Sequence, residues 1–253
     1  LNKKKTLIIS MTNNNILNNL KDRHVAITDG VFAIAMTILV LEIAVPTISE
    51  ISSGVALNEY FMTYLLPSIL IYFISFYIVY NFWENTTLLF QFKKIKDSIL
   101  TLNMLTMASV CLIPFATGFL FKFYNYTNVN IFFSLLVLII SLLYILMFML
   151  LVRDNFKKYF EKKDEIKATV NETYYDGVEL PNLKLYFRGV MLTLFYILMT
   201  PVLSSVISLI LAFFSPLASI LSFVLILILR FVIRMRRTSK DKLNDLELTD
   251  DEK

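Results

Sequence analysis

Residues 23–45 read RHVAITDGVFAIAMTILVLEIAV, an apolar run long enough to cross a lipid bilayer as one helix. The run carries two carboxylic acids, Asp29 near its start and Glu42 near its end. An ionisable side chain inside a membrane helix is costly, so it usually faces protein or water and marks a functional or structural site. We therefore expect the function of this protein to centre on this segment.

The whole chain has the composition of a membrane protein. Of its 253 residues, 57% are hydrophobic and only 17% are charged, which is more apolar than an ordinary soluble domain. Continuous apolar runs without strand-like alternation favour membrane helices over barrel strands. Six runs have the required length: 25–45, 60–82, 99–121, 130–152, 186–210 and 216–235. The predicted fold class is an all-α polytopic membrane protein with six transmembrane helices per subunit.

The basic residues predict the orientation in the membrane. Twenty-three of the 24 Lys and Arg residues lie before the first span, between the second and third, between the fourth and fifth, at the start of the fifth, or around the end of the sixth. Only Lys122 falls on the opposite side. By the positive-inside rule both termini of this multi-pass protein are expected in the cytoplasm. The net charge of +4 then reflects topology, and no nucleic-acid partner is expected.

The sequence also predicts how the chain is divided. Residues 1–237 are expected to form the six-helix domain, and the charged tail 238–253 is expected to be mobile. The connection 153–185 starts with a charged amphipathic sequence, which predicts a helical extension of the fourth span followed by a loop. Arginines at the end of the sixth span, Arg230 among them, are interpreted as a topology anchor.

The residue inventory argues against catalysis. The chain has one histidine, one cysteine and five glycines, and it lacks the GxSxG, HExxH, Walker A and GxGxxG motifs. We therefore expect neither an enzyme nor a cofactor. The TVGYG carbonyl filter of ordinary potassium channels is also absent.

A helical wheel divides the first span into two faces. At about 100° per residue, one arc of about 100° collects Ile34, Thr37, Ile38, Leu41 and Val45, with Thr37 as its only polar member. Such a stripe can meet lipid, a neighbouring helix or a pore. From the residues alone, all three interpretations stay open.

Asp29 lies about 130° from the centre of this arc and must find its partners on other helices. Arg23, six residues earlier, is also too far along the helix for an i,i+4 pair. The antiparallel second span ends at the depth of Asp29 with Asn81, Trp83 and Asn85, and Asn103 begins the third span there. One interpretation is a structural network in which a buried carboxylate is satisfied by these groups; the other is a proton-carrying or ion-binding carboxylate.

The segment Arg23-x-x-x-Ile27-Thr28-Asp29, followed by small and aliphatic residues and ending in LVLEI, resembles the first-helix signature of the transmembrane protein 175 family of potassium channels. That signature reads Arg-x-x-x-Phe-Ser-Asp. This chain carries Ile27 and Thr28 where the family has Phe and Ser. It also has Thr86 and Thr87 after Trp83, where many bacterial members carry His.

This resemblance implies a homotetramer in the lipid bilayer with the first helix of each subunit around a central pore. It places a hydrophobic pore constriction on Ile34, Ile38 and Leu41. Thr37 is the polar layer beside it, where K⁺ would bind transiently. Arg23, Thr28, Asp29, Asn81, Trp83 and Asn85 form the expected structural polar network. The implied function is passive, moderately selective conduction of potassium ions.

Two other function classes stay open at this stage. A proton- or cation-coupled secondary transporter would use Asp29 or Glu42, although matched Gly- or Pro-broken spans and an inverted repeat are absent from the sequence. A membrane scaffold without transport is the third class.

Overall fold

The apolar runs form helices in the computed structural model, which describes residues 22–43, 57–91, 97–169, 180–233 and 235. Every regular element in this part of the chain is helical. Six stretches are long and apolar enough to cross a membrane: Asp22–Leu41, Phe61–Phe90, Asp97–Phe123, Thr127–Arg153, Met191–Ala212 and Pro216–Ile233. The all-helical, six-span prediction is therefore confirmed for the described residues. The predicted tail, 238–253, lies outside them.

The elements follow one another as expected from the sequence. A first helix at residues 22–38 passes into the 3₁₀ turn η1 (Leu39–Glu42). The second span combines α3 (Leu57–Tyr60), the π-helical turn η2 (Phe61–Leu65) and α4 (Leu66–Phe90). The later elements are α5 (Asp97–Val110), α6 (Leu112–Phe123), α7 (Thr127–Thr169), α8 (Leu180–Ala212), α9 (Pro216–Leu221) and a final helix at 224–233. Because α7 runs on to Thr169, the predicted helical extension of the fourth span is confirmed.

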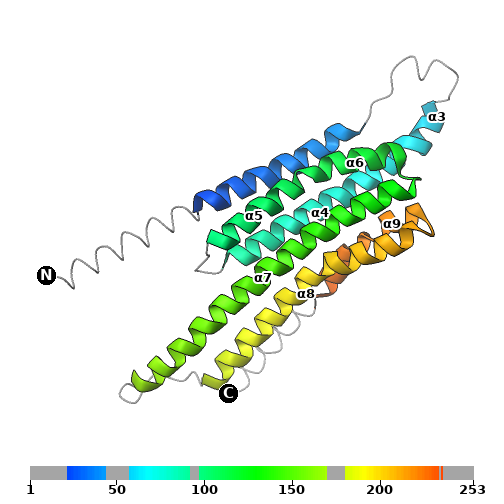
Figure 1. Cartoon of the computed structure of the whole chain (residues 1–253). Helices are drawn as coiled ribbons and strands as arrows, with labels where there is room; N and C mark the ends of the chain where they lie inside the picture. The colour runs from blue at the N-terminus through cyan, green and yellow to red at the C-terminus, as the bar shows by residue number, and fades with distance from the viewer. Residues whose placement is uncertain (1–21, 44–56, 92–96, 170–179, 234, 236–253) are drawn as a thin grey trace, which may run out of the picture.

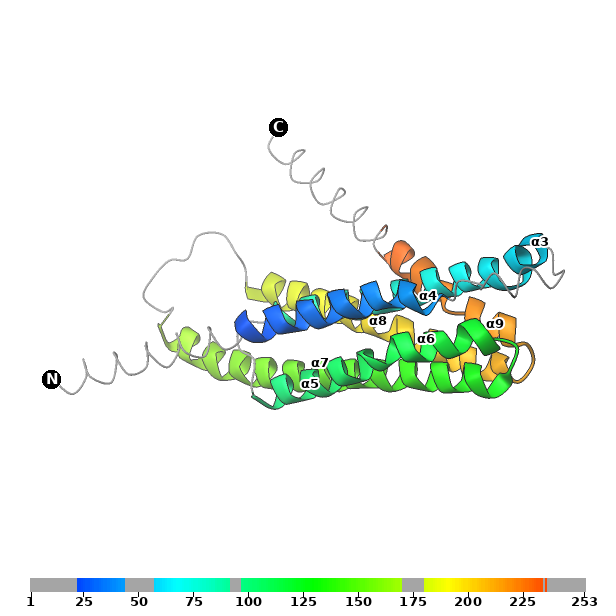
Figure 2. The same ribbon diagram turned by 90° about the horizontal axis from the view of Figure 1, so that it is seen from above.

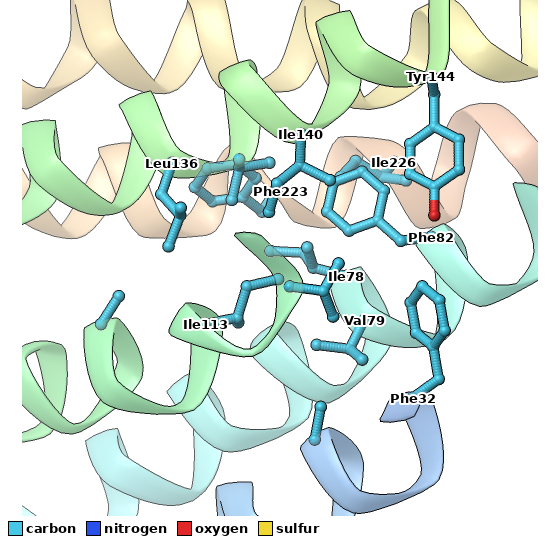
Figure 3. Packing of buried hydrophobic residues seen from close by; sticks show 14 of the residues in the cluster. Phe32, Ile78, Val79, Phe82, Ile113, Leu136, Ile140, Tyr144, Phe223 and Ile226 are labelled. Carbon is cyan, nitrogen blue, oxygen red and sulfur yellow. The ribbon is translucent and has the colours of Figure 1, made fainter. Parts of the chain in front are cut away.

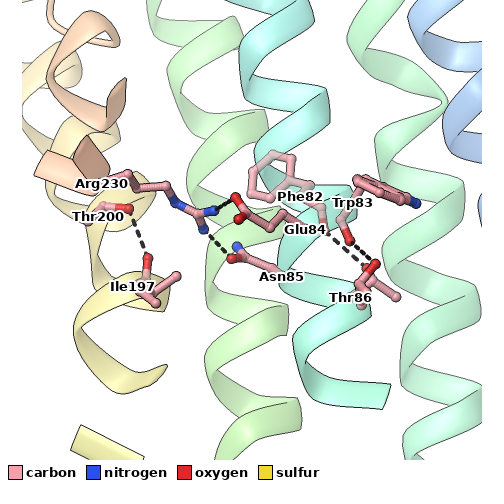
Figure 4. Close-up of polar contacts among 9 residues, drawn as sticks. Phe82, Trp83, Glu84, Asn85, Thr86, Ile197, Thr200 and Arg230 are labelled. Carbon is pink, nitrogen blue, oxygen red and sulfur yellow. Dashed lines mark hydrogen bonds and ion pairs between the residues drawn. The ribbon is translucent and has the colours of Figure 1, made fainter. Parts of the chain in front are cut away.

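Two prolines lie inside predicted spans, and only the first of them interrupts its helix. Pro114 has no N–H to donate to the carbonyl of Val110, and the third span breaks into α5 and α6 just before it. Pro201 lies inside α8 and likewise leaves the carbonyl of Ile197 without its backbone donor. The hydroxyl of Thr200 donates to that carbonyl at 2.8 Å, so α8 continues (Figure 4).

Successive spans run in opposite directions through one elongated bundle (Figure 1). We call the end at which the first helix begins the proximal end, and the other the distal end. The turn between α6 and α7 and the turn between α8 and α9 lie at the distal end (Figure 1). α7 packs against α5, α6 and α8, while α4 packs against α6, α7, α8 and η1. These two helices therefore form the centre of the bundle.

The core is built from large side chains of several spans that meet around α4 (Figure 3). Phe82 of α4 stacks on Tyr144 of α7 with ring centroids 5.5 Å apart. The Tyr144 hydroxyl is satisfied by Thr86, with the two oxygens 2.6 Å apart. Since lipid tails are as apolar as these side chains, the bundle is held by close van der Waals packing and internal hydrogen bonds.

Serine side chains join the fourth, fifth and sixth spans near their distal ends. Ser134 of α7 and Ser208 of α8 share a hydrogen bond with their oxygens 2.6 Å apart, and Ser208 lies 2.8 Å from the hydroxyl of Ser219 in α9. Ser204 donates to the carbonyl of Ser222 at 3.0 Å. Such bonds contribute about 0.6 kcal/mol each in a membrane, so together they fix the hairpin of α8, α9 and the final helix against α7.

The first helix lies at the edge of the bundle, where it is covered on one side only (Figures 1 and 2). Only 22% of its span is buried within the chain, whereas 50% of the third and of the fourth spans is buried. A membrane helix with so little cover within its own chain is free to contact lipid or another subunit.

Candidate functional site

The apolar stripe of the first helix is uncovered within the single chain. Ile34 is 59% exposed, Ile38 38% and Leu41 78%, and Thr37 between them is also exposed. The side chains that pack inward lie on the opposite face: Phe32, Ala35 and Leu39 are each at most 3% exposed. Ile34, Thr37, Ile38 and Leu41 of the predicted arc therefore lie on the free side of the helix, which also includes Ile27 and Val40. Val45, the fifth member of the arc, lies outside the described residues.

Thr37 is the polar member of the free face. Its hydroxyl lies 2.9 Å from the carbonyl oxygen of Ile34 and 3.1 Å from that of Ala33, so its single proton is directed back to the helix backbone. This bond leaves the lone pairs of the hydroxyl oxygen available on the exposed side. The oxygen can therefore accept a hydrogen bond or coordinate a cation on that side.

Asp29 and Trp83 meet at the proximal end of the bundle. The indole Nε1–H of Trp83 donates to Asp29 Oδ1 at 2.8 Å, which joins the first helix to α4. The Asp29 side chain is exposed within the single chain, in contrast to the expectation of a buried carboxylate. It lines a cavity of about 480 Å³ that also contacts Asp22 and Phe90. The carboxylate thus has one fixed hydrogen-bond donor and one open side.

A second polar cluster joins the first helix to α5. The amide Nδ2 of Asn103 lies 3.0 Å from Thr28 Oγ1 and 3.0 Å from His24 Nε2. Thr28 in turn donates to the backbone carbonyl of His24 at 2.8 Å, and the His24 ring stacks on Phe90. Asn103 therefore bonds His24 and Thr28 instead of Asp29.

The third cluster lies on the other side of α4. Arg230 of the final helix forms an ion pair with Glu84 and a hydrogen bond with the side-chain oxygen of Asn85 (Figure 4). The Arg230 side chain is 9% exposed and that of Glu84 25%. Arg230 is therefore more than a topology anchor. Asn85 accepts a hydrogen bond from Arg230 and makes no contact of this kind with Asp29.

The predicted polar network is thus divided among several contacts. Of its six members, Asp29 and Trp83 are brought together, while Thr28 and Asn85 each bond a different partner. Asn81 is 1% exposed, and its amide makes no hydrogen bond within the described part of the chain. Arg23 is exposed at the start of the first helix.

Sequence reasoning missed Glu84 and the role of Arg230. The predicted second span ended at residue 82, whereas α4 continues to Phe90 and includes Glu84. The second and sixth spans run in the same direction, and the acidic residue in the extension of the second and the basic residue within the sixth both lie near the C-terminal ends of their spans. That pattern could have indicated an ion pair, because charged residues in spans usually pair with one another.

The fold and the site define a class of protein: a multi-pass helical membrane protein whose edge helix presents an apolar stripe with one hydroxyl layer. Residues 23–114, which contain this helix and the Asp29–Trp83 contact, match the model of the family described as "Endosomal/lysosomal potassium channel TMEM175". This match, over 92 of the 253 residues, confirms the resemblance drawn from the first helix.

Two bacterial relatives align with a similar length of chain. A potassium channel of Chryseobacterium sp. (strain P1-3) is 42% identical over 98 residues, which are 38% of this chain and 47% of the relative. A potassium channel of Streptomyces collinus (strain DSM 40733 / Tue 365) is 30% identical over 99 residues, 39% of this chain and 46% of the relative. The alignment thus spans about half the length of each relative.

A solved structure extends the likeness of the fold to most of the chain. The crystal structure of a lysosomal potassium-selective channel TMEM175 homolog from Chamaesiphon minutus covers 85% of this chain and 98% of its own. The TM-score is 0.59 and the sequence identity 22%. At this identity the likeness concerns the fold, and it includes the later spans that the family model does not match.

Proposed function

We propose that this protein is the subunit of a passive, potassium-selective channel in which the first helix lines the pore. The observation that carries the proposal is the exposed stripe Ile34, Thr37, Ile38 and Leu41 on a helix at the edge of the bundle. The family match over the same helix and the potassium-channel relatives support it.

The proposed assembly is a homotetramer around a central axis. A single copy leaves one face of its first helix open, and a closed ring of identical subunits covers that face in every copy at once. The side chains of the stripe then face one another across the axis, while Phe32 and Leu39 stay packed within their own subunit. The bilayer covers the remaining apolar surface.

Conduction in this pore depends on a narrow apolar neck formed by Ile34, Ile38 and Leu41. A potassium ion that enters an apolar constriction gives up part of its hydration, which raises a free-energy barrier. The hydroxyl ring of Thr37 offsets part of that cost by direct coordination. Potassium is favoured over sodium because sodium holds its hydration water more tightly, and no carbonyl filter is required. Catalysis and cofactors have no part in this mechanism.

The proposed location is the bacterial plasma membrane, with the proximal end of the bundle in the cytoplasm. The support is the distribution of basic residues, which places 23 of 24 on the proximal side by sequence. Both termini and the connection 153–185 are then cytoplasmic, and the distal end faces outward.

Cysteine labelling of intact cells tests this orientation. In a Cys111→Ser background, single cysteines introduced in 48–58 should react with an impermeant thiol reagent added outside. Those introduced in 155–170 should react only after the membrane is opened. External labelling of the second set would reverse the proposed orientation.

Recording from purified protein in a planar bilayer tests the function itself. With potassium and sodium on opposite sides, we expect single-channel currents whose reversal potential shifts toward that of potassium. A pH gradient without a potassium gradient should drive no steady current, because passive conduction of potassium is uncoupled from protons. Absence of current from correctly assembled protein would contradict a channel function, and proton-coupled flux lost in Asp29→Asn would indicate a transporter.

A further inference from the structure

The 3₁₀ turn η1 changes the direction in which Glu42 points. If the α-helix continued through residue 42, Glu42 would lie about 40° from Ile38, on the edge of the exposed stripe. In a 3₁₀ turn, by contrast, residues three apart eclipse each other. The Glu42 side chain therefore points in the same direction as Leu39, which is 0% exposed, and not in the direction of Ile38. The change of helix type turns the carboxylate away from the stripe and leaves Leu41 on it.

Gly118 provides the space into which Glu42 turns. η1 packs on α6, and the Glu42 carboxylate lies directly against the backbone of Gly118 in the middle of that helix. A Cβ atom at position 118 would overlap Oε2 of Glu42 and lie 3.1 Å from its Cδ. The neighbouring positions Thr117 and Ala116 are both fully buried. Only a glycine at position 118 thus accommodates the carboxylate where it lies.

We propose that Gly118 forms a notch that holds the Glu42 carboxylate off the permeation path, and that this contact sets the charge of the distal pore mouth. The proposal rests on the proposed function, because it takes the exposed stripe as the pore wall. Rings of Glu or Asp side chains concentrate cations at the mouths of many cation channels. Here four such carboxylates are present in a tetramer but are turned toward α6. The mouth is lined by Leu41 instead, and cation entry gains less from their attraction.

The consequence is that a single methyl group at position 118 should change ion entry. In Gly118→Ala the new Cβ displaces the flexible end of the Glu42 side chain, and since α6 closes the way inward, we expect the carboxylate to rotate toward the exposed stripe. Four displaced carboxylates would then raise the local potassium concentration at the distal mouth. Single-channel potassium conductance should rise about twofold or more in about 10 mM KCl, where the Debye length is about 30 Å. The rise should vanish in about 1 M KCl, where that length is about 3 Å.

Glu42→Gln provides the matched control, because glutamine has the shape of glutamate without its charge. Glu42→Gln alone should lower the low-salt conductance by much less than Gly118→Ala raises it, since the wild-type carboxylate is already turned away. Gly118→Ala combined with Glu42→Gln should show no rise at low salt, although the methyl group still displaces the side chain. An equal rise in this double variant, or no rise in Gly118→Ala, would overturn the proposal.

A stability cycle tests the contact without any current. Alanine is more favourable than glycine inside a helix, so Gly118→Ala should raise the thermal stability of the detergent-solubilised protein more in a Glu42→Ala background, where the colliding carboxylate is absent, than in the wild type. If the change in stability is the same in both backgrounds, the notch does not exist. If the cycle behaves as expected and wild-type protein carries no potassium current, the contact stands and the proposed function fails.

Discussion

Replacing Arg230 with alanine should destabilise the protein by about 3 kcal/mol. Removing one partner of a buried ion pair leaves the other charge unpaired, which costs about 3–5 kcal/mol. The lower end applies here because the Glu84 side chain keeps 25% of its surface exposed, although that of Arg230 keeps only 9%. Asn85 also loses the guanidinium that its oxygen contacts. The loss should appear as a lower midpoint when solubilised protein is heated and its folded fraction is measured by size-exclusion chromatography.

A double substitution separates the pair from the packing around it. Arg230→Met with Glu84→Leu removes both charges and keeps apolar volume, which is often neutral or stabilising for a buried ion pair. This variant should therefore be more stable than Arg230→Ala. If Arg230→Ala had the same thermal midpoint as the wild type, the ion pair would contribute nothing to stability. Arg230 would then act only as a topology anchor.

Replacing Ile38 with asparagine should raise potassium conductance about tenfold, because a barrier lowered by about 1.4 kcal/mol multiplies a rate by ten. In a tetramer the substitution adds four amide oxygens to the narrow neck, where they can replace water around the ion. Ile34→Asn and Leu41→Asn should act in the same direction. Thr37→Ala should weaken the preference for potassium, since a ring of hydroxyl ligands is lost. Single-channel conductance and reversal potentials in mixed potassium and sodium solutions measure these effects.

The opposite face of the same helix supplies the control. Phe32 is 0% exposed and packs in the core, and Met36 is half-buried beside it. Substitutions at these two positions should reduce stability or assembly and leave the conductance of assembled channels unchanged. If they altered permeation as strongly as substitutions in the stripe, the first helix would not line the pore with the proposed face.

Local sequence was sufficient to predict the spans and the two faces of the first helix. A run of about 20 apolar residues has to be helical in a bilayer, since every backbone polar group must be satisfied within the segment. The period of 3.6 residues then assigns Phe32 to one side and Ile34 to the other without knowledge of any neighbour. The exposure of these residues follows that assignment. The end of the second span was less well predicted, because Glu84 and Asn85 look like the end of an apolar run and yet belong to α4.

The partners of the polar side chains were decided by the tertiary structure alone. Sequence placed Asn81, Trp83 and Asn85 at the depth of Asp29, but residues on one helix turn point in different directions, and only Trp83 points toward Asp29. Asn85 faces the final helix, which brings Arg230 from a position 145 residues later in the chain. Depth along a membrane normal can be counted from sequence. The direction in which a helix is rotated depends on packing against its neighbours, which no local pattern records.

The direction of the Glu42 side chain also depends on both the local sequence and the tertiary structure. Sequence determined that a carboxylate ends the first helix, and regular helical geometry directed it toward the stripe. The 3₁₀ turn and the absence of a side chain at Gly118, 76 residues away in the chain, direct it toward α6 instead. The sequence by itself thus determined which side chains this protein offers at each depth of the membrane. The packing of helices distant in sequence decided which of them face the free side of the first helix and which are held within the bundle.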